Sequence, residues 1–512
     1  MPADTLRFTD VFYTYDSLPD ELLTDLTFAV SSGWTGVVGR NGAGKSTLLR
    51  LAVGEAEPTS GVVDGPSPGL IVAQRTDDPP DRLTDLIAFP DAEAGRLVSI
   101  LGIDADWPYR WATLSHGERK RAQIGVALWI NPPLLAVDEP TNHLDGPARR
   151  MLATALSRYS GVGLLVSHDR QLLDTLCSQC LFLSPPRPPR LRPGGVSAGM
   201  EEQRREDEEA RRAYDRSARE VRRIQSEVTR RRADADVGHQ QAMRSKRHLR
   251  RKDSDAREKI DRARISGADG NAGRKLNQIE GRARQANEQL ESLTRPPSER
   301  TGLTIRGVRS QSDAVARLDA CTLPIGPDRA LVVPELVVEP SDRIGLVGAN
   351  GAGKSTLLEA FRAAGQFGSD HVLYIRQELS SDDARDLVRR VRDLRRDALA
   401  RVLSTIARLG SVPERILDTD LPSPGETRKL MLAEGLERKP DLVVMDEPTN
   451  HLDLLSIQCM EAALADYPGA VILVSHDVDF LEALVRDYWE VEVEGNRAGL
   501  TIRPGPASRP DQ

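Results

Sequence analysis

Two nine-residue segments have the residue types and spacing of a phosphate-binding loop. GRNGAGKST begins at Gly39, GANGAGKST begins at Gly348, and both match the pattern G-x-x-x-x-G-K-[ST]. Glycines let backbone N–H groups curl around a phosphate, and the lysine neutralises the β- and γ-phosphates of a nucleotide. The predicted nucleotide contacts are Gly39, Asn41, Gly42, Gly44, Lys45, Ser46, Thr47, Gly348, Asn350, Gly351, Gly353, Lys354, Ser355 and Thr356. The alternative for either segment alone is a tight glycine turn.

Acidic residues follow an apolar run downstream of each loop. LLAVDEP contains Asp138 and Glu139, and LVVMDEP contains Asp446 and Glu447. An aspartate at a strand end can hold Mg²⁺, and the adjacent glutamate can polarise an attacking water. Glu139 and Glu447 are therefore predicted to be catalytic. The predicted magnesium ligands are Ser46, Gln74, Asp138, Ser355, Gln377 and Asp446.

Histidine and glutamine recur in the same order in both halves. VSHD occurs twice and contains His168 and His476, which are predicted to contact a γ-phosphate as catalytic residues. Gln74 and Gln377 follow the strand-like runs GLIVA and VLYIR. A single histidine or glutamine of this kind is more often structural, but the repeated order favours a role in nucleotide chemistry.

The two sets of residues keep one register. Lys45 and Lys354 are 309 residues apart, while the paired aspartates, histidines and the serines Ser115 and Ser423 are each 308 apart. Coincidence does not hold four elements in one register, so the chain contains a duplicated domain. Each glycine-rich loop follows a β-rich run and precedes a helix-like segment, which predicts an α/β fold.

Two short segments complete a resemblance to the ATP-binding-cassette (ABC) family over nearly all of both halves. In that family LSGGQ contacts the γ-phosphate of the nucleotide bound in the opposite cassette, so that two cassettes close head-to-tail over two ATPs. The matching segments here are LSHGE and PSPGE, which depart from that pattern at His116 and Pro424. We call them the signature segments. The resemblance implies nucleotide contacts by Ser115, Gly117, Glu118, Ser423, Gly425 and Glu426.

The wider organisation resembles the ABC-F class, soluble twin-cassette ATPases that act on ribosomes. EPTNHLD occurs at both catalytic sites, whereas transporter cassettes more often read EPTSALD, and a long, basic, helix-like segment joins the halves. No apolar run approaches the roughly 18–20 residues of a membrane helix, and no signal peptide begins the chain, so a cytoplasmic location is expected. The alternative is the ATP-binding subunit of an ABC transporter working with a separate membrane protein. A DNA-repair ABC ATPase would carry a longer coiled coil with a zinc hook.

The connecting segment has its own charge and periodicity. Residues 201–300 hold 27 Lys and Arg against 20 Asp and Glu, although the whole chain has a net charge of −7. Apolar residues recur with the spacing of a coiled coil, which predicts an antiparallel helical hairpin. The two predicted seams are Tyr214, Ala218, Val221, Ile224 and Val228, and Leu276, Ile279, Ala283, Ala286, Leu290 and Leu293. The predicted domains are a first nucleotide-binding domain at 1–195, a helical linker at 196–298 and a second nucleotide-binding domain at 299–512.

Eleven Lys and Arg lie within residues 221–252, opposed by three acidic residues. A solvated helix face is the alternative for any one of them, but the cluster favours contact with RNA backbone. The ABC-F resemblance implies that the linker reaches from the ribosomal exit site towards the peptidyl-transferase centre, with ribosomal RNA and P-site transfer RNA as partners. The segment from Thr229 to Gly273, with a turn at GADGNAG, would be its tip.

Members of the class include antibiotic-protection and housekeeping factors. Some housekeeping members carry an added arm in the first cassette, but Ser115 lies only 41 residues after Gln74, against 46 between Gln377 and Ser423. This spacing leaves no room for such an arm and favours an antibiotic-protection ATPase. The expected nucleotide is ATP, the expected cofactor is Mg²⁺, and both cassettes are expected to act within one monomer. A housekeeping ribosomal factor remains the alternative.

The two predicted sites are duplicated but unequal. Tyr15 lies 30 residues before Lys45 and offers a stacking surface for adenine, whereas no aromatic residue lies between Thr301 and Gly345. The second signature segment also lacks the leading leucine. We expect two active ATP sites of different strength. Cys177 and Cys180 form a CxxC without a second pair, so ordinary thiols are favoured over a zinc site.

Overall fold

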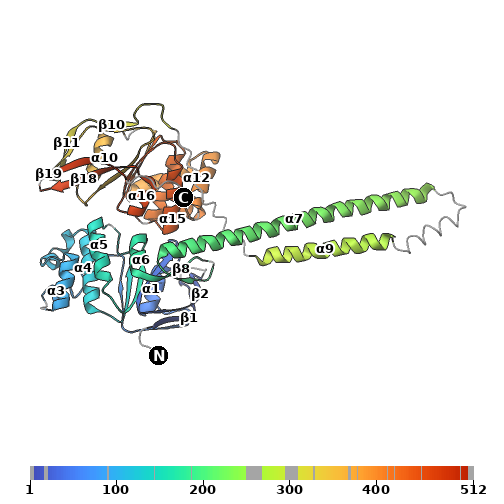
Figure 1. Cartoon of the computed structure of the whole chain (residues 1–512), viewed down its shortest axis with the longest axis horizontal. Coiled ribbons are helices and arrows are strands. Elements are labelled where there is room, and N and C mark those ends of the chain that lie inside the picture. Colours follow the sequence, from blue (N-terminus) through green and yellow to red (C-terminus); the bar gives the residue numbers. More distant parts are fainter. Residues whose placement is uncertain are drawn as a thin grey trace. The chain divides into compact units, whose positions relative to one another are not determined.

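The structure is a computed structural model of the 512-residue chain (Figure 1). It describes residues 5–15, 21–88, 91–142, 144–185, 187–248, 268–293, 309–326, 329–366, 371–377, 379–411, 413–419, 421–450, 452–495 and 497–505. The chain divides into two compact units. One comprises Met1–Gly199 with Arg300–Gln512, and the other comprises Met200–Glu299.

The first half of the larger unit is built on two sheets. A three-stranded antiparallel sheet has the order β2-β1-β4, and a mainly parallel sheet has the order β5-β6-β7-β3-β8-β9. Every residue of β6 and β7 is buried, as expected for central parallel strands covered on both faces. The strands are β1 (Thr5–Tyr13), β2 (Leu23–Ser31), β3 (Gly33–Gly39), β4 (Ser60–Asp64), β5 (Gly69–Val72), β6 (Leu134–Asp138), β7 (Val162–Val166), β8 (Cys177–Leu183) and β9 (Arg190–Pro193).

Three helices of this half begin within a sequence motif or directly after it. Helix α1 begins at the lysine of the glycine-rich loop after β3, α4 begins inside the signature segment, and α5 follows EPTNHLD. The helices are α1 (Lys45–Val53), α2 (Leu83–Ala88), α3 (Ala92–Leu101), α4 (His116–Ile130), α5 (Gly146–Leu156) and α6 (Arg170–Leu176), with 3-10 turns η1 (Trp107–Tyr109) and η2 (Trp111–Thr113). The chemistry-bearing residues therefore lie at the carboxyl ends of parallel strands and at helix starts.

The second half repeats this plan with a larger main sheet. Its strand order is β11-β12-β19-β18-β14-β17-β16-β15, and β10 pairs with β13 separately. The strands are β10 (Ala316–Leu318), β11 (Cys321–Ile325), β12 (Arg329–Val333), β13 (Leu336–Val338), β14 (Arg343–Gly348), β15 (Val372–Ile375), β16 (Leu442–Asp446), β17 (Ala470–Val474), β18 (Asp487–Glu494) and β19 (Arg497–Pro504). The helices are α10 (Lys354–Ala363), α11 (Ser381–Arg392), α12 (Arg396–Arg408), α13 (Pro413–Asp418), α14 (Pro424–Leu436), α15 (Leu454–Ala465) and α16 (Val478–Leu484).

The smaller unit is built from two helices that lie side by side (Figure 1). They are α7 (Val196–His248), whose first residues belong to the larger unit, and α9 (Ala268–Ser292). Gln225 Nε2 donates to Asn287 Oδ1 at 3.5 Å, and Arg232 pairs with Glu280 at 2.6 Å. The partner number falls as the α7 number rises, so the helices are antiparallel, as predicted.

The predicted apolar seams meet between α7 and α9. Ile224, Val228 and Ile279 form a buried cluster against which Ala283 and Ala286 pack. Each of these five residues was predicted from the heptad-like spacing. The side chains of residues 234–276, including Leu276, lie outside the described residues.

The prediction of a turn at GADGNAG is wrong. Residues 268–273 form the beginning of α9 instead. Glycine costs only about 1 kcal/mol relative to alanine inside a helix, so a continuing helix can override the local preference for a turn. Residues 249–267, which contain much of the predicted tip, lie outside the described residues.

Candidate nucleotide sites

Each glycine-rich loop holds its lysine against the loop backbone. Lys45 Nζ donates to the carbonyls of Gly39 and Arg40 at 2.9 and 3.1 Å. Lys354 makes the same contacts in the second half, at 2.8 Å to Gly348 and 3.0 Å to Ala349. Burial lowers the pKa of both lysines, while the carboxylates nearby oppose that shift. Each ammonium is thus preplaced where the loop would enclose phosphate.

Glycine is required at the start of the helix after each loop. Gly44 and Gly353 have φ values of 88° and 105°, and each is the N-cap of its helix. A Cβ at Gly44 would lie 2.5 Å from the Leu23 side chain, and one at Gly353 would lie 2.5 Å from Ile325. Both conformation and space therefore exclude a side chain. The helix N-terminus that follows favours an anion.

A serine and an aspartate meet beside each lysine. Ser46 Oγ donates to Asp138 Oδ2 at 2.6 Å, and Ser355 Oγ donates to Asp446 Oδ2 at 3.3 Å. Burial raises the pKa of both aspartates, and the serine hydrogen bond opposes it. Hydroxyl and carboxylate oxygens are hard donors, so these pairs fit the predicted Mg²⁺. The described residues contain no cluster of three or more His, Cys, Asp and Glu suited to a metal.

The predicted catalytic glutamates are turned into the sites by an unusual backbone conformation. Glu139 has φ 45° and Glu447 has φ 50°. Their backbone N–H groups donate to Val166 and Val474, in the adjacent strands, at 2.9 and 2.8 Å. Non-glycine residues seldom adopt positive φ. The hydrogen bond to the adjacent strand stabilises each glutamate in this conformation.

Each predicted histidine faces the glutamate of its own half. His168 Nε2 lies 3.1 Å from Glu139 Oε1, and His476 Nε2 lies 3.5 Å from Glu447 Oε1. Burial raises the pKa of Glu139 to about 8 and that of Glu447 to about 7. Burial, with Lys354 next, lowers the pKa of His476 to about 4. A base with a pKa near 7 to 8 is suited to accept a proton from water at neutral pH.

Both signature segments form the same capped helix start. Ser115 Oγ accepts from Glu118 N at 3.3 Å, while Glu118 Oε2 accepts from Ser115 N at 2.7 Å. Ser423 and Glu426 repeat this capping box at 3.4 and 3.0 Å. Pro424 occupies a first-turn position, where the missing N–H is tolerated. The departures from LSGGQ leave the local fold of both segments alike.

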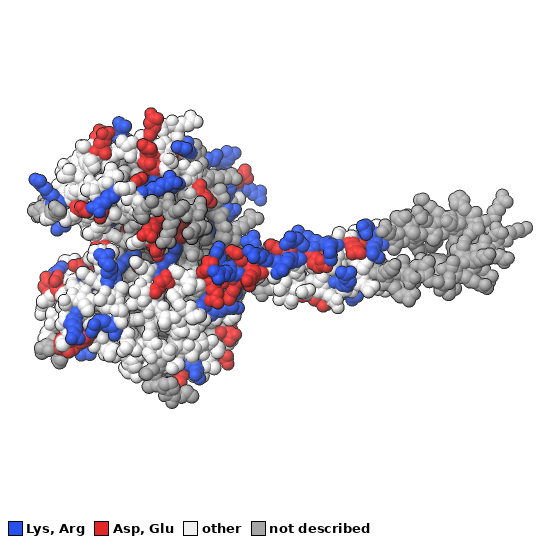
Figure 2. Space-filling view, in the orientation of Figure 1, with Lys and Arg blue, Asp and Glu red and all other residues white. Residues whose placement is uncertain are grey.

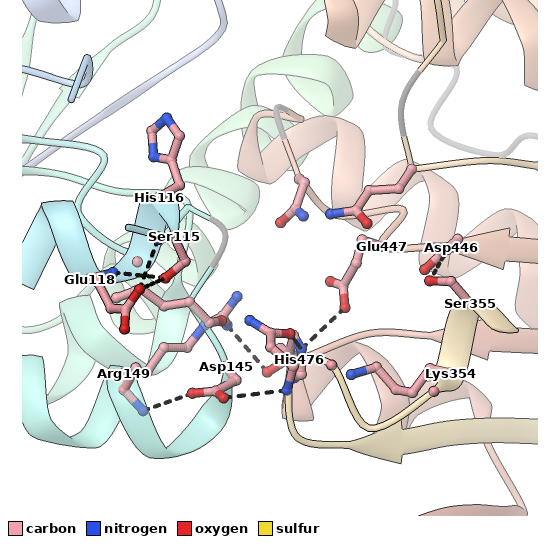
Figure 3. Close-up of a pocket in the computed structure, with 18 of the residues that line it drawn as sticks. Ser115, His116, Glu118, Asp145, Arg149, Lys354, Ser355, Asp446, Glu447 and His476 are labelled. Carbon is pink, nitrogen blue, oxygen red and sulfur yellow. Dashed lines mark hydrogen bonds and ion pairs between the residues drawn. The ribbon is translucent and has the colours of Figure 1, made fainter. Parts of the chain in front are cut away.

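A cavity of about 910 Å³ lies between the two halves (Figure 3). On one side it is lined by the first signature segment with Ser115, His116, Gly117 and Glu118. On the other side it is lined by the second glycine-rich loop with Lys354 and Ser355, and by Asp446, Glu447, Gln377 and His476. The sequence-predicted residues of the second site therefore converge on one pocket, with a signature serine supplied by the opposite half.

Comparisons with known proteins agree with this geometry. A family profile described as "ABC transporter" matches residues 23–142 and 333–450. The tylosin resistance ATP-binding protein TlrC of Streptomyces fradiae is 30% identical over 93% of this chain and 95% of its own. The ATP-binding protein Uup of Caulobacter vibrioides is 30% identical over 92% of this chain and 74% of its own. The chain belongs to the ABC-F family.

A solved structure supports the fold of this ABC-F protein. The archaeal ribosome recycling factor aABCE1 has a TM-score of 0.60 at 17% identity, over 96% of this chain and 89% of that chain. The predicted α/β fold with two ABC nucleotide-binding domains is confirmed, and the protein is an ATPase with paired cassettes. Within the described residues, no helix has the length and apolar character needed to cross a membrane.

The final aspartate of each EPTNHLD was missed as a site residue. Asp145 Oδ2 accepts from Asn350 N of the second glycine-rich loop at 3.4 Å. Asp453 Oδ2 accepts from Asn41 N of the first loop at 3.3 Å. Each aspartate thus holds the phosphate-binding loop of the opposite cassette in this ABC-F protein. The signal was present, because both segments keep an identical sequence at the register of the repeat.

A buried cation behind each signature segment was also missed. Lys120 Nζ donates to the carbonyl of Gln74 at 3.1 Å, and Arg428 donates to the carbonyl of Gln377. These residues follow Ser115 and Ser423 by five positions. Burial lowers the pKa of Lys120 to about 8. Each cation ties a signature helix to the glutamine segment of its own cassette.

The residue predicted to stack on adenine in the first site lies beside the first glycine-rich loop. Tyr15 OH lies 2.8 Å from Thr47 Oγ1, and its ring packs edge-on against Tyr13. Ile325 lines the second pocket beside Gly353. Ile325 is the counterpart of Leu23, which lies beside Gly44 in the first half. Gln74 is exposed, and its predicted metal contact stays a prediction.

Proposed function

We propose that this ABC-F ATPase binds the ribosome in its ATP-bound form and protects translation from an antibiotic through the linker formed by α7 and α9. The role of ATP in this proposal is supported by one pocket, which lies between the signature segment of the first cassette and the glycine-rich loop of the second. ATP binding between the two faces would stabilise the closed pair, because only that pair completes the contacts to the γ-phosphate. Both cassettes lie in one chain, so a monomer suffices.

The side chains of the second site define how it would hydrolyse ATP. Lys354 neutralises phosphate charge, and Ser115 offers a hydroxyl from the opposite cassette. Glu447 accepts a proton from the attacking water, and His476 keeps the water and γ-phosphate in line. Mg²⁺ held by Ser355, Asp446 and Gln377 would neutralise charge on the phosphates. Glu139, His168, Asp138 and Ser46 would act in the same way in the first site.

The described part of the linker carries cations suited to an RNA backbone. Between residues 211 and 232, nine arginines stand against Asp215, Glu220 and Glu227. Figure 2 shows these cations along the surface of the linker, interleaved with acidic side chains. Exposed pairs such as Arg223 with Glu220 contribute little stability, so phosphates can compete for these arginines. Ribosomal RNA and P-site transfer RNA are the proposed partners.

The antibiotic role is supported by the names and lengths of relatives. The erythromycin resistance ATP-binding protein MsrA of Staphylococcus epidermidis is 27% identical over 96% of this chain and 98% of its own. This chain thus spans nearly the whole of MsrA and 95% of TlrC, but 74% of Uup. The match in length favours TlrC and MsrA, while the ribosome protection protein VmlR of Bacillus subtilis is covered over 79% of its length.

Cell-free translation tests the protective role. Ribosomes inhibited by tylosin or erythromycin should resume synthesis when the wild-type protein and ATP are added. The matched control is the Glu139→Gln/Glu447→Gln variant. We expect it to bind ribosomes with ATP but not to be released by hydrolysis. Failure of the wild-type protein to relieve inhibition by either drug, while still binding ribosomes, would leave a housekeeping role as the better account.

The competing function is that of an ATP-binding subunit for an ABC transporter. The matching family profile carries that description. Such a subunit would sediment with membranes rather than with ribosomes. Membrane fractionation of cells producing the protein therefore separates the two functions.

A further inference from the structure

Arg149 reaches from the first cassette into the second nucleotide site. It lies in α5, one helical turn after Asp145, and it lines the same cavity as Glu447 and His476 (Figure 3). Its Nη1 donates to the backbone carbonyl of His476 at 3.2 Å. The side chain is 18% exposed. A guanidinium of the first cassette therefore contacts the segment that places the histidine of the second.

The same guanidinium is fixed within its own cassette. Its Nη1 also lies 3.3 Å from Asp169 Oδ2, and its Nε donates to the carbonyl of Leu144 at 3.1 Å. Asp169 follows His168 directly, and Leu144 precedes Asp145. Arg149 thus joins both VSHD segments and the EPTNHLD segment through one planar group. A planar guanidinium with several donors suits such a bridge, whereas an ammonium does not.

The charge of Arg149 acts on the residues that face the second pocket. Burial lowers the pKa of His476, and Lys354 and Arg149 lower it further. Burial raises the pKa of Glu447, and Lys354 and Arg149 oppose that rise. The arginine therefore favours a neutral imidazole and an ionised carboxylate in the opposite cassette.

The repeat does not supply this contact twice. The position 308 residues after Arg149 is Ile457, which is 1% exposed and packs in the core of the second cassette. A second contact between cassettes is equally one-sided, because Arg170 pairs with Glu461 at 2.9 Å. The repeat places Val478 and Ala153 at the corresponding positions. The second site thus receives an arginine from the opposite cassette, whereas the residue at the corresponding position of the second cassette is an apolar core residue.

We propose that Arg149 is a positioning residue supplied in trans to the second ATP site, where it holds the His476 segment for hydrolysis. It also links that site to the His168 segment of the first cassette through Asp169. The inference rests on the proposed assignment of Glu447 and His476 to hydrolysis in the second site. It makes hydrolysis in the second site dependent on the position of α5 in the first cassette.

Single-site variants provide the test. Glu139→Gln leaves hydrolysis to the second site, and Glu447→Gln leaves it to the first. In the Glu139→Gln background, Arg149→Ile should lower kcat about 10-fold, as for loss of one charge-assisted hydrogen bond, with KM for ATP within about twofold. Arg149→Lys should lose less than Arg149→Ile. In the Glu447→Gln background, Arg149→Ile should change kcat less than about twofold.

Arg150→Ile is the matched control, because Arg150 is the exposed neighbour on the same helix. Thermal unfolding shows whether Arg149→Ile folds, and Arg149→Gln replaces it if it does not. An equal loss in both backgrounds would reduce Arg149 to a structural role, and full activity in the Glu139→Gln background would remove the role altogether. If Glu447 and His476 do not act in hydrolysis at the second site, the result differs from both of these outcomes. Glu447→Gln alone would then leave the total ATPase activity unchanged.

Discussion

His168 Nε2 lies 3.1 Å from Glu139 Oε1, and the Glu139 side chain is only 7% exposed. The carboxyl group has few ways to be solvated, so its ionisation depends on the cations and on the imidazole around it. His476 and Glu447 repeat the pair at 3.5 Å. If these glutamates accept a proton from water as proposed, that transfer should be the step most sensitive to pH in both sites.

ATP hydrolysis should rise with pH in each site. A general base works when deprotonated, so a raised pKa moves the active range upward. Burial raises the pKa of Glu139 to about 8 and that of Glu447 to about 7. In Glu447→Gln the rate should reach half of its maximum near pH 8, and in Glu139→Gln it should do so near pH 7. Steady-state kcat between pH 6 and 9 measures both, and flat profiles in both variants would contradict the assignment.

The signature serines should act on the opposite cassette. Ser115 lines the pocket that contains Lys354 and Glu447. Ser115→Ala should therefore lower kcat at least about 10-fold in Glu139→Gln, where the second site hydrolyses, but little in Glu447→Gln. Ser115→Thr keeps the hydroxyl that caps α4 and controls for helix stability, since loss of the cap costs about 1 kcal/mol. The reverse pattern would exclude a head-to-tail pair.

Tyr15 should contribute binding to the first site. Its ring is half-buried next to Thr47 of the first loop. Base stacking on an aromatic ring contributes about 1–3 kcal/mol, so Tyr15→Ala should weaken ATP binding about 5- to 100-fold. Tyr15→Phe should bind almost normally, because the ring is kept. Titration of each variant in the Glu447→Gln background with a fluorescent ATP analogue measures the effect, and equal weakening by Phe would point to the hydroxyl instead.

The seam of the linker should be needed for ribosome binding but not for hydrolysis. Ile279 is 7% exposed and packs with Ile224 and Val228. Ile279→Asp buries a carboxylate there and should cost about 2–4 kcal/mol of helix pairing. Limited proteolysis should show cleavage of α9, ribosome binding should fall, and ATPase without ribosomes should remain. Gln278→Asp, at the exposed neighbouring position, is the control. Unchanged ribosome binding by Ile279→Asp would argue against the hairpin as the contact.

The placement of the glycine-rich loops and their lysines could be predicted because it depends on local sequence. Lys45 and Ser46 follow a loop whose glycines dictate the backbone, so the motif alone places them on the phosphate side of α1. The same holds for the linker seam, where heptad spacing identifies Ile224 and Ile279.

Several of the residues that escaped prediction act across the two cassettes. Asp145 and Arg149 contact Asn350 and His476, more than 200 residues away in sequence. No local pattern gives the distance between such positions. The positive φ of Glu139 and Glu447 likewise depends on hydrogen bonds to neighbouring strands. The turn at GADGNAG failed for the opposite reason, because a local preference was overridden by the helix.

Sedimentation through sucrose with ribosomes tests the central claim most directly. Glu139→Gln/Glu447→Gln should bind ATP without hydrolysing it and remain closed. We predict that the variant sediments with ribosomes in the presence of ATP and remains at the top of the gradient without nucleotide. If it stays at the top with ATP present, although a fluorescent analogue shows that both sites are filled, the ribosome is not the target of this ATPase.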